Sequence, residues 1–168
     1  MRSFNGPWLP DGARASVDPV GNWALGVDAQ LLHNLGMTLL RTIHHAAIIC
    51  SDYRVSKAFY VDLLGLTVIG EHYRAERQSY KLDLALPGGG QIELFSFPSP
   101  PPRPSRPEAQ GLRHLAFTVD DIELSKAWLT SQGVEVEPIR VDEYTGQRLT
   151  FFADPDGLPL ELYESPPA

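Results

Sequence analysis

The chain has 168 residues, of which 43% are hydrophobic and 21% charged, a balance typical of a soluble globular protein with room for one domain. Its formal net charge of −7 repels phosphate backbones, which argues against a nucleic-acid partner. The one cysteine, Cys50, cannot form an intramolecular disulfide, which excludes a disulfide-stapled secreted fold. No apolar stretch has transmembrane length and no secretory signal is evident, so we expect a cytoplasmic protein with no membrane partner.

Residues 1–38 differ in composition from the rest of the chain. They carry three prolines, several glycines and two tryptophans without any repeating pattern. Composition of this kind is typical of a loosely ordered extension. We therefore expect an N-terminal extension over 1–38 and a folded domain over 39–165.

From residue 43 onward the same sequence pattern occurs twice, as in an internal duplication. In each copy an aliphatic run follows a histidine, as in a strand, and ends at Asp52 or Asp121, either of which can cap a helix. In the second helix Leu124, Ala127 and Trp128 form an apolar stripe that we expect to face the core. Three more strand-like runs follow in each copy, over 66–73, 80–86 and 91–97 in the first and over 134–141, 147–152 and 158–163 in the second.

A proline-rich segment, 98–110, joins the two copies. A ligand motif for an adaptor domain is one interpretation of it, but a stiff polyproline connector is favoured. Its arginines, Arg103 and Arg106, are interpreted as solvated surface. The sequence thus predicts an α+β fold of two tandem βαβββ modules, with module one at 43–97 and module two at 111–164.

Histidine and glutamate recur at matching places in the two modules, as His45 with Glu93 and as His114 with Glu161. Because side chains alternate along a strand, each glutamate faces away from its aliphatic neighbours. A carboxylate within an apolar strand is costly unless it is paired or bound to a cation. Any one of these residues alone would be interpreted as half-exposed surface. Two imidazoles and two carboxylates together suit Zn²⁺, Ni²⁺, Co²⁺ or Mn²⁺, so we predict one divalent metal ion held by all four.

Four other residues have weaker interpretations. His44 adjoins His45 and so faces the other way, which favours a packed or hydrogen-bonded role. Lys81 and Arg148 lie six residues before the two turns. They could contact an anionic substrate or be solvated cations on an edge strand, and strand parity does not decide between these. Cys50 ends an apolar run, where we expect a buried structural thiol.

These motifs resemble the vicinal oxygen chelate superfamily, which includes glyoxalase I, bleomycin-resistance proteins, fosfomycin-resistance enzymes, methylmalonyl-CoA epimerase and extradiol dioxygenases. The resemblance is greatest to small bacterial glyoxalase I-like (lactoylglutathione lyase-like) proteins. It implies two βαβββ modules that form a cupped mixed sheet around a metal site, the glyoxalase/bleomycin resistance/dioxygenase fold. The stretches that carry it are His45 with Asp52-Tyr53 and Leu64-Gly65, Ile92-Glu93-Leu94, His114-Leu115-Ala116-Phe117, and Asp154-Pro155-Asp156-Gly157 with Glu161-Leu162.

The resemblance also implies an activity. Bacterial glyoxalase I uses two histidines and two glutamates, to which the four residues above correspond, with Glu161 as the catalytic base. The implied reaction converts the hemithioacetal of a 2-oxoaldehyde and a thiol through an enediolate, as a lyase or isomerase. The implied cofactor is one divalent metal ion, with Ni or Zn ahead of Co or Mn, and the implied partners are a small-molecule substrate and a second copy of the chain in a homodimer.

Alternatives stay open within this resemblance. A metal-dependent epimerase, or another vicinal oxygen chelate enzyme, pairs a metal with the same type of proton transfer. A non-catalytic protein that binds a small molecule or a metal is the other class. Glutathione-dependent glyoxalases have an arginine and an asparagine where this chain has Ile49 and Phe97, so the identity of the thiol is also open.

Overall fold

The computed structural model describes residue 36 and residues 40–104 and 106–165 of the chain. The extension expected over 1–38 therefore lies outside the described residues, apart from Gly36. Among the described residues, all the helices and strands lie in the unit that begins at Ile43. None of the helices among the described residues is both long and apolar enough to cross a lipid bilayer.

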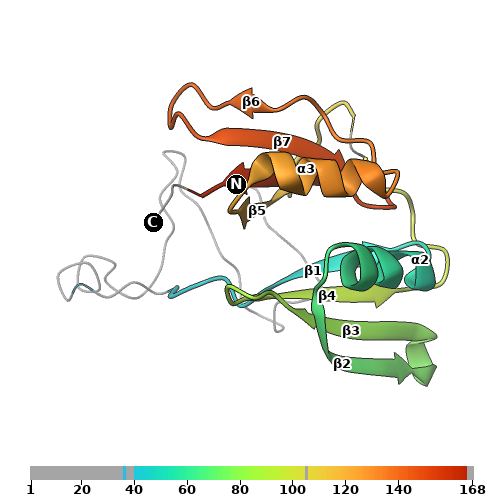
Figure 1. The fold of residues 1–168 in the computed structure, drawn as a ribbon. Helices are drawn as coiled ribbons and strands as arrows, with labels where there is room; N and C mark the ends of the chain where they lie inside the picture. Colours follow the sequence, from blue (N-terminus) through green and yellow to red (C-terminus); the bar gives the residue numbers. More distant parts are fainter. Residues whose placement is uncertain (1–35, 37–39, 105, 166–168) are drawn as a thin grey trace, which may run out of the picture. The chain divides into compact units, whose positions relative to one another are not determined.

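Module one forms a four-stranded sheet in the order β1-β4-β3-β2 (Figure 1). Strands β1 and β4 are parallel, and the other two pairs are antiparallel. A loop of glycines, 88–90, joins β3 to β4. The elements of module one are β1 (His45–Cys50), α2 (Tyr53–Ala58) with its π-helical continuation (Phe59–Leu63), β2 (Thr67–Arg74), a 3₁₀ turn (Ala75–Arg77), β3 (Ser79–Ala85) and β4 (Gln91–Ser96).

Module two repeats this topology in the order β5-β8-β7-β6, with β5 parallel to β8 and the other pairs antiparallel (Figure 1). The α+β fold and the duplication expected from the sequence are thus confirmed. The elements of module two are β5 (Leu115–Val119), α3 (Ile122–Ser131), β6 (Arg140–Val141), β7 (Arg148–Ala153) and β8 (Pro159–Glu164).

Both helices begin at the aspartates that the sequence pointed to. The carboxylate of Asp52 accepts hydrogen bonds from the N–H groups of Arg54 and Val55, at 2.9 and 3.1 Å. The carboxylate of Asp121 accepts one from Leu124 N–H at 2.9 Å. These bonds satisfy donors that have no partner within the first turn, so each cap fixes where its strand ends and its helix begins.

Strand β6 is shorter than expected: the sequence predicts a strand over 134–141, but the structure has only Arg140–Val141 in strand conformation there. Pro138 has no N–H to donate to a strand ladder. Around it the backbone is held by separate contacts: Glu137 N–H donates to Phe151 O at 2.9 Å, and the Thr150 hydroxyl donates to Glu137 O at 2.8 Å. The predicted strand is therefore wrong over most of its length.

The stripe expected on the second helix is also wrong. Leu124 is 69% exposed and Trp128 is 52% exposed, whereas Ile122 and Leu129 are the buried residues of α3. The indole N–H of Trp128 donates to Leu63 O at 3.1 Å, so this ring lies at the rim of the core, where its polar atom has a partner. Sequence periodicity located the helix but misassigned its buried face.

A buried hydrogen bond connects the two modules. The hydroxyl of Tyr60, which has no exposed surface, donates to Asp154 Oδ2 at 3.0 Å. The other carboxylate oxygen of Asp154 accepts the N–H groups of Asp156 and Leu158, at 2.9 and 2.8 Å. Burial raises the pKa of Asp154 and of the Tyr60 hydroxyl, which keeps the tyrosine protonated as the donor. Apolar side chains from both modules surround this pair in one core.

We predict that Tyr60→Phe destabilises the protein by about 1–3 kcal/mol, because it leaves one oxygen of a buried carboxyl without its donor. Urea unfolding measures this loss. Tyr144→Phe is the matched control, since Tyr144 is 90% exposed and the same hydroxyl is removed there. Equal stability of the two variants would contradict the importance of this bond.

Candidate functional site

The first predicted pair of site residues lies on one face of the module one sheet. His45 is the first residue of β1 and Glu93 lies within β4, which is the parallel neighbour of β1. His45 Nε2 is 3.6 Å from Glu93 Oε2. Alternation along β4 buries Ile92 and Leu94 on the other face, against the core. The aliphatic residues of the strand thus fix the direction in which its carboxylate points.

The second pair repeats this arrangement on module two. His114 precedes β5, and Glu161 lies within β8, opposite Ala116 in the register. His114 Nε2 is 3.0 Å from Glu161 Oε2. Glu161 is only 7% exposed, which makes it one of the few buried charged residues. Among the described residues its carboxylate has one ion-pair partner, this imidazole.

The structure therefore brings the four predicted ligands together as two pairs rather than as one cluster. Within the described parts of the chain, no group of three or more histidine, cysteine, aspartate or glutamate residues is placed to hold a metal ion. The four-ligand site stays a prediction, and one chain presents two halves of it.

Each half has the spacing that a chelated metal requires. Metal bonds of 2.0–2.2 Å to imidazole and carboxylate place two neighbouring ligand atoms roughly 2.8–3.6 Å apart, the shorter values in octahedral and the longer in tetrahedral geometry. Of the two observed N–O separations, 3.0 Å lies within this range and 3.6 Å at its upper end. Nitrogen and oxygen donors of this kind suit a borderline divalent ion. The residues present therefore fit the implied metal.

His44 supports the first half. Its Nδ1 lies 2.9 Å from Nδ1 of His45, so one ring donates to the other. That bond occupies Nδ1 of His45 and leaves Nε2 facing Glu93. A hydrogen bond of this type fixes the tautomer and orientation of a metal-ligating histidine. The expected hydrogen-bonded role of His44 is confirmed, but the expectation that it faces away from His45 is wrong, because the two rings contact each other.

A lysine distinguishes the first half from the second. Lys81, on β3, forms an ion pair with Glu93 at 3.0 Å and another, shorter one with Asp83. Burial lowers the pKa of Lys81, but its hydrogen bonds to Asp83 and Glu93 outweigh that effect and raise the pKa above its ordinary value. The lysine thus stays charged and holds Glu93 in place, while Asp83 compensates its charge.

Arg148 does not correspond to Lys81 in the structure. Lys81 pairs across the sheet with Phe95, two residues after Glu93, and the equivalent position in module two is Leu149, opposite Tyr163. Arg148 points to other partners, with Glu164 at 2.6 Å and Glu123 at 3.2 Å. The second half therefore has an apolar side chain where the first half has its lysine.

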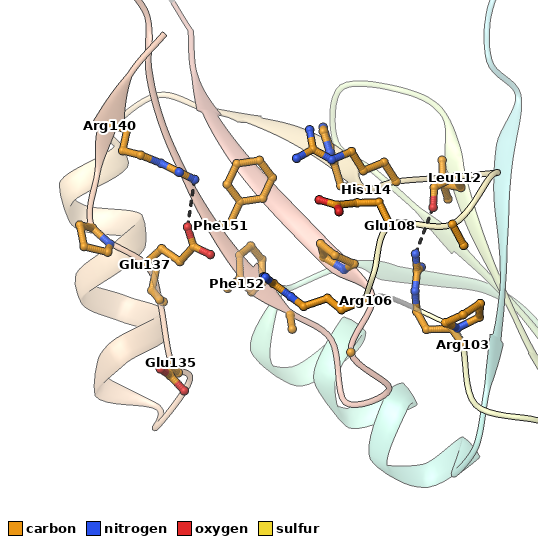
Figure 2. A pocket seen from close by; sticks show the side chains of 18 residues that line it. Arg103, Arg106, Glu108, Leu112, His114, Glu135, Glu137, Arg140, Phe151 and Phe152 are labelled. Carbon is orange, nitrogen blue, oxygen red and sulfur yellow. Dashed lines mark hydrogen bonds and ion pairs between the residues drawn. The ribbon is translucent and has the colours of Figure 1, made fainter.

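A cavity of about 670 Å³ lies beside the second half, between the linker and the β7 side of the sheet (Figure 2). His114 and Phe151 form part of its wall, and their rings meet edge to face with centroids 5.3 Å apart. Arg106 and Glu108 extend from the linker toward Phe151 and Phe152 (Figure 2). The volume lies within the range of small-molecule sites.

Cys50 lies outside this chemistry. It is 1% exposed at the end of β1, and burial raises the pKa of its thiol, so the thiol is protonated and shielded. The structural role expected from its apolar run is confirmed.

Sequence reasoning missed the ion pair of Lys81 with Asp83. The sequence does contain a sign of it: the charged residues Lys81 and Asp83 of module one align with the apolar residues Leu149 and Phe151 of module two.

Comparison with known proteins gives concordant matches. The model of the Glyoxalase/Bleomycin resistance protein/Dioxygenase superfamily matches residues 42–162. The uncharacterized protein YaeR of Escherichia coli (strain K12) is 66% identical over 125 residues, which are 74% of this chain and 97% of YaeR. The 2-epi-5-epi-valiolone epimerase of an Actinomyces species is 27% identical over 145 residues, covering 74% of this chain and 79% of the epimerase. The crystal structure of the glyoxalase family protein from Enterococcus faecalis superposes with a TM-score of 0.71 at 53% identity, over 76% of this chain and all of that one.

We predict that Arg148→Met changes the pH dependence of stability and leaves ligand binding intact. Hydrogen bonding to Arg148 lowers the pKa of Glu164 below its ordinary 4.5. A carboxylate with a lowered pKa in the folded state stabilises the protein above the unfolded pKa, and this contribution is lost as the pH falls through the folded pKa. Melting temperatures should therefore differ between wild type and variant at pH 7 and converge below pH 4.5. A difference that persists unchanged in acid would contradict this.

Proposed function

Because the chain belongs to the glyoxalase/bleomycin resistance protein/dioxygenase superfamily, we propose that it is a cytoplasmic, metal-dependent enzyme that acts on a small carbonyl compound. The form that the site favours is a glyoxalase I-like lyase or isomerase whose substrate is the hemithioacetal of a 2-oxoaldehyde and a thiol. The observation that carries this proposal is the pair of imidazole–carboxylate couples, His45 with Glu93 and His114 with Glu161, each at chelating separation.

In this proposal the metal is held by all four residues, in a site completed by a second copy of the chain. One chain presents two separate halves, so a homodimer in which each half meets the opposite half of the partner gives two complete sites. Ni or Zn is the favoured ion, with Co or Mn as alternatives. Once bound, the ion stabilises negative charge that develops on adjacent substrate oxygens.

The two carboxylates have different roles in this proposal. Lys81 holds Glu93, at 3.0 Å, as a fixed ligand. Glu161 has no lysine or arginine beside it within the described parts of the chain, and its position in a half-enclosed apolar strand limits competing hydrogen bonds from water. A base must be free to reach the carbon-bound proton and to carry it. Glu161 would therefore take this proton and return it to the neighbouring carbon, while His114 would remain a ligand of the ion.

An epimerase is the second candidate, and the similarity to the Actinomyces epimerase favours it. Such an enzyme would remove a proton beside a carbonyl in the same way but deliver a proton to the same carbon from the opposite face, which requires a proton donor on that face. The products differ, since a lyase or isomerase moves the oxidation level between two carbons and an epimerase changes only stereochemistry. Analysis of products formed in D₂O distinguishes the two. A protein that binds metal and carbonyl compound without turnover is the remaining candidate.

We predict that two inactive variants restore one another. His45→Ala damages the first half of the metal site and His114→Ala damages the second half. Neither variant homodimer therefore contains a complete site. A mixture that exchanges subunits forms mixed dimers in which one of the two sites is intact, so about a quarter of the metal binding and turnover should return. Elemental analysis and an activity assay with methylglyoxal and a panel of thiols measure this. If the sites form within one chain, the mixture stays inactive.

We further predict that Glu161→Gln lowers kcat by a factor of at least about 10² while it weakens metal binding much less, since the amide keeps an oxygen donor but cannot accept the proton. Glu93→Gln should instead affect mainly metal affinity. Glu76→Gln, an exposed substitution outside the site, is the matched control. Wild-type turnover by Glu161→Gln would reject this residue as the base.

A further inference from the structure

Arginine side chains gather around the cavity beside His114. Four of the chain's eleven arginines line it, three from the linker and its continuation and one from β6, although the protein as a whole carries a net charge of −7. The planar guanidinium group presents paired N–H donors that match the oxygens of carboxylates and phosphates. The same lining carries three glutamates, Glu108, Glu135 and Glu137, so the arginines outnumber the acids by one. The four are Arg103, Arg106, Arg113 and Arg140.

Two of these arginines already have clear roles in the fold. Arg140 forms an ion pair with Glu137 at 2.9 Å, and its guanidinium lies over the ring of Phe151 at 5.4 Å from the centroid. Arg103 donates to Leu112 O at 3.0 Å, which connects the middle of the linker to the start of module two (Figure 2). These contacts fix the wall and the linker rather than leave donors for a ligand.

The other two, Arg106 and Arg113, have no ion-pair partner within the described residues, although both line the same cavity. Arg113 directly precedes His114, so it enters the wall next to the second half of the site. Arg106 extends from the linker toward Phe152 (Figure 2). The space between them has apolar walls from Phe151, Phe152 and Pro159.

We propose that Arg106 and Arg113 bind an oxyanion, a carboxylate or phosphate group, at one end of the molecule whose carbonyl end reaches His114 and Glu161. The identification of this molecule as the substrate rests on the function proposed above, whereas the binding of the anion does not require turnover. The cavity of about 670 Å³ admits an apolar middle between the two ends. The substrate class is thus an anionic carbonyl compound or its thiol adduct.

A carboxylate in the wall of the same cavity leads to a second prediction, in which a substitution strengthens anion binding instead of weakening it. Glu137 is compensated by Arg140 at 2.9 Å, but Glu108 extends into the cavity from the linker between the two free arginines in sequence (Figure 2). Its charge repels an incoming anion. Removal of this charge should therefore strengthen binding of the oxyanion, whereas removal of the arginines should weaken it.

The test uses the full-length protein after its metal has been removed with a chelator, so that no anion binds through the ion. Inorganic phosphate and propionate serve as probes, and isothermal titration together with the NMR signals of the arginine side chains reports binding. Arg106→Met with Arg113→Met should weaken binding by at least about tenfold, in line with the loss of charge-assisted hydrogen bonds. Glu108→Gln should strengthen it.

Arg54→Met with Arg77→Met is the matched control. Both residues are exposed and lie outside the cavity, and this double substitution changes the net charge by the same amount as the cavity variant. Binding of either probe that the cavity variant loses and the control keeps supports the proposal, and the preferred probe identifies the oxyanion. Absence of binding by the wild type, or equal loss in both double variants, overturns it. Either result leaves the subunit-mixing experiment unaffected, so failure of this inference is distinct from failure of the proposed function.

Discussion

The site depends on two glutamates that lie within otherwise apolar strands. In β4 and in β8 the neighbouring leucine and isoleucine side chains must pack on the core, so strand alternation forces Glu93 and Glu161 onto the opposite face. A carboxylate there loses much of its hydration and requires a partner. In each module that partner is a histidine at the start of the parallel neighbouring strand, and the same geometry that relieves the burial cost creates the chelating pair.

The two modules are duplicates, but the surroundings of their His–Glu pairs differ. In the proposed function this difference gives the two carboxylates different roles. If both carboxylates were held by lysine, neither would be free to move a proton, and if neither were held, the metal would lack a rigid anchor. Lys81 and Asp83 occur on β3 of module one, whereas Leu149 and Phe151 occupy the equivalent places on β7. The ion pair at 3.0 Å thus distinguishes Glu93, which has a lysine partner, from Glu161, which has none among the described residues.

Much of this could be predicted from the sequence because the relevant signals are local. The capping aspartates and the βαβββ order of elements follow from short-range patterns, and the duplication supplies an internal check on the matching histidines and glutamates. The pairing of each histidine with the glutamate of its own module depends instead on long-range contacts between parallel strands. The buried face of α3 was misassigned from its own sequence, because Ile122 and Leu129 pack in the core while the half-exposed Trp128 donates to Leu63 O. Likewise Pro138 and side-chain bonds shorten β6, and Lys81 is placed by cross-strand register.

The linker illustrates the same limit in a functional setting. Its prolines indicate a stiff connector, and its arginines, taken as sequence, are indistinguishable from solvated surface. Only the fold shows that the hydrogen bond from Arg103 to Leu112 O holds the segment against module two, where Arg106 faces an aromatic wall and Arg113 adjoins His114. A connector that is stiff because of its prolines can present charged groups at fixed positions with little loss of entropy on binding. Stiffness and the presentation of charged groups are therefore compatible properties of one segment.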